Sequence, residues 1–399
     1  MTQVEIDRLG AAGDGIADGA YYPFTLPGEL VSPGPPMKVL RAAPDRVQPV
    51  CRHFGSCGGC SVQHASDAFL ETWKQDMVRR ALAAHGLTAD LRPVQTSPPH
   101  SRRRAVLTLR RTKKTVQMGF HGRGSDQLVD LAECHVMRPG ILALRPQLER
   151  LARDGASRKG ALHVSITESL TGWDVAVTGG KAPDRALRTA IAQAGRGFAR
   201  LAWNGEVIVQ RDPPVQVIGR AHVVPPPGSF LQATADGAQA LTRTVRQALG
   251  QAAHVADLFC GIGTFTLPLA EQATVHGVEA ESGMIQALDA AWRRTSGLKT
   301  VTTEVRDLFR RPLIAAELDR FDAVVLDPPR AGALAQVTAL AQGRVPVIAM
   351  VSCNPVTFAR DASVLVAAGY ALNWVQIVDQ FRWTGHVELV ARFGAKTVR

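Results

Sequence analysis

Long apolar runs are missing from this 399-residue chain, since none approaches the roughly 20 residues that a membrane-spanning helix needs. Its first residues, MTQVEIDRLG, contain neither the basic segment nor the apolar segment of a secretion signal. Internal repeats and low-complexity tracts are also absent. These absences exclude a helical membrane span and a repeat array, so we expect a globular, monomeric protein of the cytoplasm that has no membrane partner.

Cysteines and acidic residues are both scarce. Six cysteines in so long a chain are too few for a disulfide scaffold, and three of them crowd between Cys51 and Cys60. That usage suits a reducing compartment, with metal binding or catalysis as the role of the thiols. The 46 lysines and arginines exceed the 35 aspartates and glutamates, which gives a net charge of +11. Such an excess favours a polyanionic partner.

The pattern along the chain changes twice. Residues 1–47 combine glycines with short apolar runs and close on SPGPP, which is typical of a small β-barrel. Residues 48–225 have the mixed pattern of an α+β domain, with apolar spacing that predicts a helix over residues 66–86. After VVPPPGS, residues 226–399 alternate short buried strands with helical patterns, which predicts a doubly wound, Rossmann-like α/β domain.

The glycine-rich loop in DLFCGIGTF lacks the third glycine of a dinucleotide-binding fingerprint, because Thr266 stands there. Gly261 and Gly263 still let the backbone approach a bound cofactor closely. Glu279 ends the next strand, where a carboxylate accepts hydrogen bonds from ribose hydroxyls, and Asp307 is placed to serve the adenine end. The pattern favours S-adenosylmethionine, which has no phosphate. A tight turn without a ligand is the alternative.

Cys353, in VSCNP, follows an apolar strand and should lie at the edge of the sheet where open α/β folds bind ligands. Asp327, in LDPPR, leaves another strand at that edge on a loop stiffened by prolines. A thiolate that adds to carbon 6 of uracil activates carbon 5 toward a methyl donor. Glu388, in TGHVELV, is the candidate base that then removes the proton from carbon 5, and His386 should share its strand face. A buried apolar cysteine and a surface carboxylate are the alternatives.

The cysteines in CRHFGSCGGC follow the spacing C-x5-C-x2-C, and a fourth lies far away in AECHVM; the four are Cys51, Cys57, Cys60 and Cys134. Four soft ligands suit zinc or an iron–sulfur cluster. Structural zinc sites usually have two close pairs, so this pattern favours a four-iron cluster, with zinc as the alternative.

Basic side chains gather around the strand-like segment AVLTL; they are Arg102, Arg103, Arg104, Arg110, Arg111, Lys113, Lys114 and Arg123. A basic β ribbon beside a small barrel is a good phosphate-binding surface, although such a run is also typical of a solvated face. A base attacked at carbon 6 must leave its stack. The expected partner is therefore RNA, with the target in a loop, a bulge or an opened strand.

Together these motifs resemble those of the bacterial RNA uracil-5-methyltransferases, and most closely the iron–sulfur branch that modifies 23S ribosomal RNA. The resemblance covers DRLGAAGDGIADG with LPGE, which is similar to a TRAM RNA-binding barrel, then the four cysteines, RRRAVLTLR, DLFCGIGTF, GVE, LDPPRAG, SCNP and TGHVE. It implies S-adenosylmethionine and a [4Fe–4S] cluster as cofactors, and a helix over residues 66–86 that packs on the catalytic domain. The site residues that it implies are Cys51, Cys57, Cys60 and Cys134 for the cluster, Gln232, Phe259, Thr264, Glu279, Asp307 and Asp327 for the cofactor, and Cys353 and Glu388 for catalysis.

Four residues depart from the pattern of that family. Thr234 and Thr264 stand where asparagine is common, which indicates reorganised cofactor contacts. Arg382 and Trp383 replace a more usual Pro-His or Pro-Arg pair ahead of Glu388.

Three other functions fit parts of the sequence. An RNA cytosine-5-methyltransferase uses the same addition but carries a second cysteine after the DPP strand, where this chain has only prolines and Arg330. A base N-methyltransferase needs no cysteine at position 353. A non-catalytic RNA-binding protein with a metal-stapled domain needs none of the catalytic residues.

Overall fold

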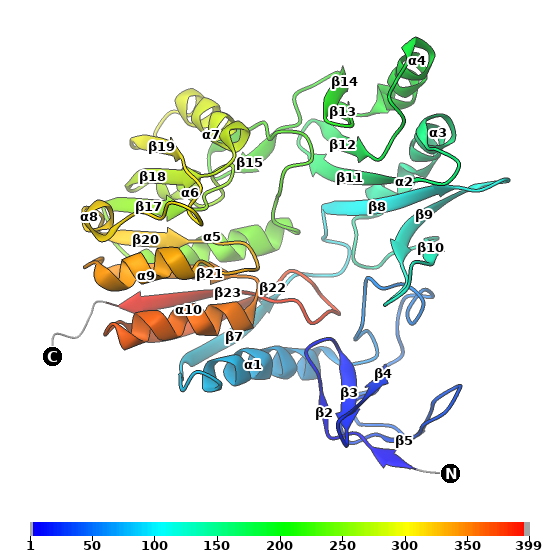
Figure 1. Cartoon of the computed structure of the whole chain (residues 1–399), viewed down its shortest axis with the longest axis horizontal. Helices are drawn as coiled ribbons and strands as arrows, with labels where there is room; N and C mark the ends of the chain where they lie inside the picture. Colours follow the sequence, from blue (N-terminus) through cyan, green and yellow to red (C-terminus); the bar gives the residue numbers. More distant parts are fainter. Residues whose placement is uncertain (1–2, 395–399) are drawn as a thin grey trace.

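The computed structural model describes residues 3–394, which form a small N-terminal unit, a central sheet and a large C-terminal sheet (Figure 1). The strands of the N-terminal unit are β1 (Val4–Glu5), β2 (Arg8–Leu9), β3 (Asp14–Ala17), β4 (Ala20–Pro23), β5 (Leu30–Ser32) and β6 (Lys38–Arg41). They pair as two three-stranded antiparallel sheets, β1-β5-β6 and β2-β3-β4. This part of the chain is strand-rich, as its glycine-punctuated sequence predicted.

The middle of the chain forms a second sheet, which has its own helices and its own apolar core. Its elements are β8 (Arg104–Arg111), β9 (Val116–His121), β10 (Leu128–Asp130), α2 (Pro139–Ala143), α3 (Arg145–Gly155), β11 (Ala161–Ser169), β12 (Gly172–Thr178), α4 (Arg185–Ala194), the 3-10 turn Gly195–Gly197, β13 (Arg200–Trp203) and β14 (Glu206–Gln210). The strands make one seven-stranded sheet in the order β10-β9-β8-β11-β12-β13-β14. Leu148 and Leu151 of α3 and Ile191 of α4 fill the apolar core against it. A hairpin of β15 (Gln216–Ile218) and β16 (Ala221–Val223) then leads into the C-terminal part.

The C-terminal part alternates strands and helices. Its elements are α5 (Ala235–Leu249), β17 (His254–Leu258), α6 (Thr266–Leu269), β18 (Thr274–Glu279), α7 (Ser282–Arg294), β19 (Val301–Val305), α8 (Ala315–Leu318), β20 (Ala323–Leu326), α9 (Leu334–Gln342), β21 (Val347–Ser352), α10 (Pro355–Ala367), β22 (Ala371–Asp379) and β23 (Glu388–Gly394). Their strands lie in the order β19-β18-β17-β20-β21-β23-β22, and only β23 runs antiparallel to its neighbours. The predicted doubly wound α/β fold is confirmed.

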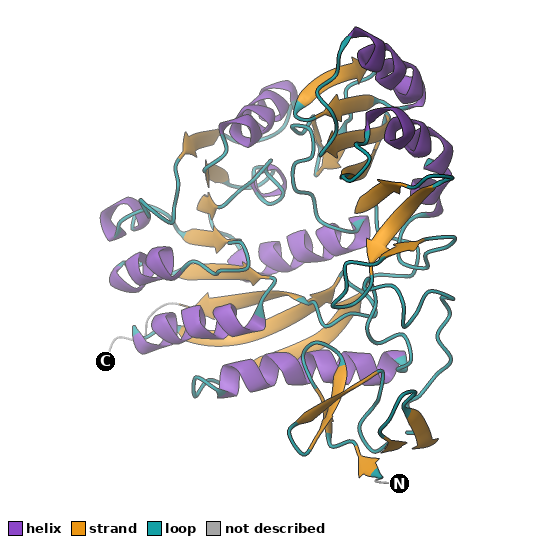
Figure 2. Ribbon diagram, turned by 45° about the vertical axis from the view of Figure 1, so that its right-hand side comes forward, coloured by secondary structure: helices purple, strands orange, loops and turns teal. Residues whose placement is uncertain are grey.

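Apolar residues occupy both faces of the inner strands, which is why helices cover both sides of this sheet (Figure 2). In β17, Ala256 and Leu258 belong to the core that includes α9 and α10, whereas Val255, directly before them, belongs to the core that includes α5. The chain reverses its winding direction between β17 and β20. In open α/β sheets the carboxyl ends of the strands at such a point form the ligand crevice.

Two elements from early in the chain complete the C-terminal sheet. Helix α1 (Asp67–Ala83) packs its Val78 and Leu82 into the same core as α10, and β7 (Asp90–Thr96) pairs in parallel with β22 at the edge of the sheet (Figure 1). A boundary that assigns residues 48–225 to a central domain therefore cuts through this sheet. Short-range pattern could not show the pairing, because β7 joins a strand that lies far along the chain.

No helix within residues 3–394 is both long enough and apolar enough to cross a membrane.

A buried ion pair joins α1 to the sheet. Lys74 of α1 is fully buried, and its Nζ lies 2.5 Å from Oδ2 of Asp379 at the end of β22. Burial lowers the pKa of Lys74, and the Asp379 carboxylate opposes that shift. The backbone of Asp379 also accepts a hydrogen bond from Ser97 N (2.9 Å), so the same residue holds the end of β7.

Removing one partner of this pair should leave an unpaired buried charge. We expect Lys74→Met to lower the free energy of unfolding by about 3–5 kcal/mol. The double variant Lys74→Met/Asp379→Asn, which buries no charge, should be more stable than Lys74→Met alone. Urea denaturation measures both. As a control, Arg188→Met breaks the exposed Arg188–Glu206 pair and should cost less than about 1 kcal/mol.

Candidate active site

The loop after β17 has the backbone shape of a cofactor cradle. Phe259, Gly261 and Gly263 all have positive φ, at 63°, 55° and 92°. A Cβ at Gly263 would lie 2.5 Å from Leu288 Cδ1, so packing excludes any side chain there. A Cβ at Gly261 would meet only Met284 Sδ, at 3.9 Å, so this glycine faces open space. The two glycines therefore have different roles, one in packing and one in leaving room for a ligand.

Acidic side chains surround this loop as the sequence predicted. Glu279 ends β18 and accepts hydrogen bonds from Gly261 N (3.1 Å) and Ala280 N (2.7 Å), which fixes its carboxylate beside the loop. Asp307 accepts one from Phe309 N (2.9 Å), and the Phe309 ring lies 5.4 Å from that of Phe259. The rings of Phe259 and Phe309 and the carboxylates of Glu279 and Asp307 thus belong to the loops next to the open space at Gly261.

Asp257 is a residue whose role the sequence did not reveal. It is fully buried in β17, its Oδ2 accepts a 2.5 Å hydrogen bond from Thr266 Oγ1, and its Oδ1 has no partner among the residues described. Burial raises its pKa to about 7. An unpaired buried acceptor is costly unless a ligand supplies the donor. This unpaired acceptor and the open space at Gly261 are two features of the same loop region that a bound molecule with donor groups would suit.

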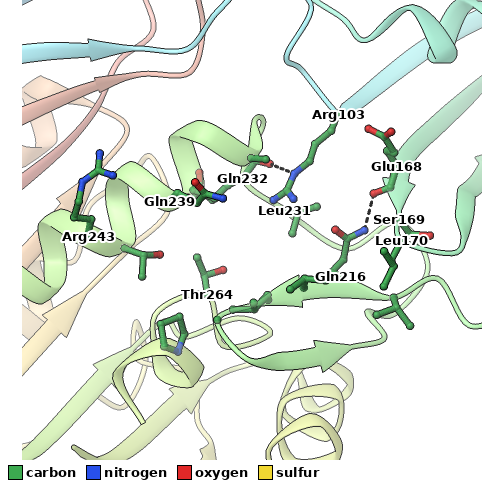
Figure 3. A pocket seen from close by; sticks show the side chains of 18 of the residues that line it. Arg103, Glu168, Ser169, Leu170, Gln216, Leu231, Gln232, Gln239, Arg243 and Thr264 are labelled. Carbon is green, nitrogen blue, oxygen red and sulfur yellow. Dashed lines mark hydrogen bonds between the residues drawn. The ribbon is translucent and has the colours of Figure 1, made fainter. Parts of the chain in front are cut away.

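Gln232 and Thr264 line a cavity of about 930 Å³ between the central and C-terminal sheets (Figure 3). Gln232 is held from both sides, because its Oε1 accepts from Gln380 Nε2 (2.7 Å) and its backbone carbonyl accepts from Arg103 Nε (3.4 Å). Cys353, Asp327 and Glu388 do not line this cavity.

The hydroxyl of Thr234 caps α5, since it accepts a hydrogen bond from Gly237 N (2.9 Å), so this departure from the family pattern retains a helix-capping group.

Strand register brings the expected nucleophile and base together. In the antiparallel pair β21–β23, Ser352 lies opposite Leu389, so the next residues along each strand, Cys353 and Glu388, face each other at the edge of the sheet. Cys353 is half-buried and Glu388 is 5% exposed. The geometry thus places the thiol and the carboxylate at one opening.

The loop with Asp327 is tied to the loop with Cys353. Asn354 Nδ2 and Thr357 Oγ1 both donate 3.1 Å hydrogen bonds to the carbonyl of Arg330. Asn354 also caps α10, since its Oδ1 accepts from Val356 N (3.1 Å). Hydrogen bonds therefore join the two loops, and they keep the predicted site residues that follow β20 and β21 close together.

Neighbouring carboxyls perturb one another at this edge. Burial raises the pKa of Glu388 to about 8 and that of Asp327 to about 7, and the negative charges of Asp327 and Asp257 add to these shifts. Burial likewise raises the pKa of the Cys353 thiol to about 11, to which Glu388 and Asp327 contribute, while Arg330 opposes it. Such clustered shifts are typical of functional sites.

The sequence predicted that His386 shares the strand face of Glu388, and the structure does not show this. It is exposed and lies in the loop before β23, where its ring contacts Phe381 at 5.8 Å. The side of its ring that packs against Phe381 is still shielded from water, and this partial desolvation and the positive charge of Arg330 lower its pKa. The prediction was wrong because β23 begins only at Glu388, so the alternation of a strand does not extend back to His386.

The four expected cluster cysteines are brought into one region. Arg52 N donates to Glu133 Oε1 (2.8 Å) and Ala132 N to His53 Nε2 (3.0 Å), so the segment that starts at Cys51 lies against the one that ends at Cys134. The region also supplies amide donors to sulfur, from Gly59 to Cys57 (3.4 Å) and from Met137 to Cys134 (3.5 Å). Within residues 3–394, no three Cys, His, Asp or Glu side chains converge in a metal-binding geometry.

The basic run around β8 does not form a single exposed ribbon. Arg102, Arg103 and Arg104 are partly buried, and burial lowers the pKa of each. Arg123 pairs with Asp14 of the N-terminal unit (2.6 Å), so it joins two parts of the fold. Lys113 and Lys114 remain exposed in the turn after β8. The charge count alone could not separate these roles.

The raised pKa of Glu388 makes stability depend on pH. Below about pH 4.5 the carboxyl is protonated in both states; between there and about pH 8 only the unfolded chain ionises, so folding stability falls. We expect Glu388→Gln to lose less stability than the wild type over that range, by about 1.4 kcal/mol for each unit of pKa shift. Urea denaturation at several pH values tests this, and parallel curves would contradict it.

Known proteins resemble this chain over nearly all its length. Residues 212–392 match the family described as tRNA (Uracil-5-)-methyltransferase. An uncharacterized RNA methyltransferase of Rhizobium meliloti is 46% identical, with 97% of this chain and 98% of that protein covered. A 23S rRNA (uracil(1939)-C(5))-methyltransferase of Nitrosococcus oceani is 33% identical, with 98% and 95% covered.

Among solved structures, the Pyrococcus abyssi tRNA (uracil-54, C5)-methyltransferase, crystallised with S-adenosyl-L-homocysteine, shares the fold. The two agree with a TM-score of 0.76 at 24% identity, with 98% of this chain and 100% of that one covered. From the length and degree of its similarity to the relatives, the chain belongs to the RNA uracil-5-methyltransferase family.

Proposed function

We propose that this protein methylates carbon 5 of a uracil in RNA with S-adenosylmethionine as methyl donor. The observation that carries the proposal is the register of β21 and β23, which sets Cys353 opposite Glu388 beside the Asp327 loop. The proposal is supported by the position of these residues at the ends of β20, β21 and β23, on the edge of the doubly wound sheet where such folds bind ligands and where Gly261 and Glu279 also lie.

The chemistry follows from the residues at that edge. The Cys353 thiolate adds to carbon 6 of uracil, and the electron pair of the 5,6 double bond becomes an enolate. Bound adenosylmethionine supplies the methyl group that carbon 5 then takes. Glu388 accepts the proton from carbon 5, the double bond re-forms, and the bond between carbon 6 and the Cys353 sulfur breaks. A pKa of about 8 suits Glu388 to proton transfer near neutral pH.

The residues of the cradle give the adenosyl group its expected contacts. Glu279 is placed for the ribose hydroxyls, Asp307 for the adenine and Phe259 for stacking, while Gln232, Thr264 and Asp327 complete the site. The unpaired Oδ1 of Asp257 adds an acceptor for a donor group of the ligand.

We further propose 23S ribosomal RNA as the substrate, in keeping with the Nitrosococcus oceani relative. The target uridine should lie in a loop or a single strand, because a base attacked at carbon 6 must be flipped out. The net charge of +11 suits such a polyanion. We propose that the protein acts as a cytoplasmic monomer, with residues 1–47 as a TRAM-like RNA-binding unit, 48–225 as the cluster-bearing unit and 226–399 as the methyltransferase unit, whose sheet and core α1 and β7 complete from within residues 48–225.

We also propose that Cys51, Cys57, Cys60 and Cys134 hold a [4Fe–4S] cluster, with zinc as the alternative. The hydrogen bonds that join residues 51–53 to residues 132–134 support it, since they gather the four thiols from distant parts of the chain. Amide donors to sulfur are the usual environment of such clusters. The cluster would fasten the loop to the central sheet.

The reaction is tested with wild type and Cys353→Ala. Each is incubated with tritiated-methyl adenosylmethionine and 23S RNA from cells that lack the modification, and the digested RNA is separated by chromatography. We expect label in 5-methyluridine with the wild type and a loss of at least about 10⁴-fold with Cys353→Ala, because no other residue supplies the covalent step. Label in 5-methylcytidine or in a base amine, or equal labelling by the variant, would exclude the mechanism.

Metal content tests the cysteine site independently of activity. Protein purified without oxygen should carry about four irons per chain and absorb near 400 nm if the four thiolates hold a cubane cluster. Cys134→Ser should lose both signals, whereas Cys260→Ser, which changes a buried thiol in the cofactor loop, should retain them. One zinc per chain would instead support the alternative metal.

A further inference from the structure

Residues 380–387 connect β22 to β23 and deliver Glu388 to the edge of the sheet. The start of this segment is fixed within the catalytic part. Gln380 is 1% exposed, its side chain packs on Gly237, and its amide bonds Gln232. Phe381 N donates to Asp379 Oδ1 (3.0 Å). The remainder of the segment leaves the catalytic sheet and packs elsewhere.

Trp383 is the point where the segment enters the N-terminal unit. Its side chain is 7% exposed and belongs to a buried apolar cluster with Leu9, Leu26, Val62 and Trp73. Its carbonyl accepts hydrogen bonds from Ser61 N (2.9 Å) and Val62 N (3.1 Å), directly after the cysteine loop. Its φ is +64°, a conformation that a bulky side chain adopts only where its surroundings enforce it.

Two neighbours of Trp383 make the same connection. Arg382 forms an ion pair with Asp67 at the start of α1. Gly385 lies so close to the N-terminal unit that a Cβ there would come within 2.0 Å of the carbonyl oxygen of Ala11. Side chain, backbone and charge thus all fasten this segment to residues that precede the catalytic sheet in sequence.

We propose that Trp383 is a positioning residue for Glu388, and that the N-terminal unit sets the place of the base through it. The inference rests on the proposed function, in which Glu388 takes the proton from carbon 5. Only four residues separate Trp383 from Glu388, and Val387 among them is fully buried, so the segment has little slack. A shift of Trp383 therefore moves the start of β23.

The proposed chemistry gives this displacement a distinct signature. Addition of Cys353 to carbon 6 and methylation of carbon 5 both precede the action of Glu388. A misplaced base therefore leaves the methylated uracil attached to Cys353, because the bond between carbon 6 and sulfur breaks only when the carbon 5 proton departs. A general loss of folded protein would instead lower attachment and release together.

The experiment compares Trp383→Ala, Gly385→Ala and Trp383→Phe with wild type on the same RNA and tritiated-methyl donor. Labelled protein–RNA adduct is quantified on denaturing gels and released 5-methyluridine by digestion. We expect the first two variants to slow release about 10- to 100-fold relative to methyl transfer, since a misplacement of about 1 Å costs a catalytic group that much. Trp383→Phe keeps an aromatic ring in the cluster and should recover most of the loss.

Trp203→Phe provides the control, because Trp203 is also a buried tryptophan but lies in the central sheet, so its variant should leave the ratio of adduct to product unchanged. An unchanged ratio in both Trp383→Ala and Gly385→Ala would overturn the inference while the proposed function stands. If Trp383→Ala does not fold, Gly385→Ala decides, because it displaces the segment and leaves Trp383 in place. Absence of 5-methyluridine from the wild type would instead overturn the proposed function.

Discussion

The buried ion pair between Lys74 and Asp379 joins α1 to the end of β22. Two charges removed from water are tolerated only when they face each other closely, so α1 and the end of β22 must keep their relative position. Asp379 also anchors Phe381 and the backbone of Ser97. One buried aspartate therefore joins three parts of the fold: its carboxylate bonds α1 and the segment that leads to Glu388, and its backbone carbonyl bonds the end of the edge strand β7.

A second constraint is the concentration of acidic groups at the active edge. Asp257, Asp327 and Glu388 all have raised pKa values because burial disfavours their charged forms, and the Cys353 thiol shares that environment. The positive charge of Arg330 opposes the shift at the Cys353 thiol. A positively charged ligand, such as a sulfonium, would lower these pKa values and bind more favourably than its neutral product.

Much of the fold and of the site could be predicted because it rests on local signals. The run of buried strands, the glycines after β17 and the strand ends at Asp327 and Cys353 follow from short-range pattern, and the doubly wound sheet confirms them. Features that depend on distant pairing could not be predicted. The place of β7, the internal role of Arg123 and the anchoring of Trp383 all join segments whose local sequences carry no sign of their partners.

The position of β7 has a consequence for how the chain folds during synthesis. Gln376 Nε2 bonds the carbonyl of Pro93 across 283 residues, and β7 has no other strand to pair with in the eight-stranded sheet. During synthesis, α1 and β7 therefore stay without their partners until β22 has left the ribosome. The pairing of β7 with β22 is then a slow, non-local step late in assembly. A fragment that begins at the doubly wound region would expose the edge of β22, and exposed edges recruit other strands. Dissecting this enzyme into its sequence segments would thus separate β22 from β7 and create a piece that tends to aggregate.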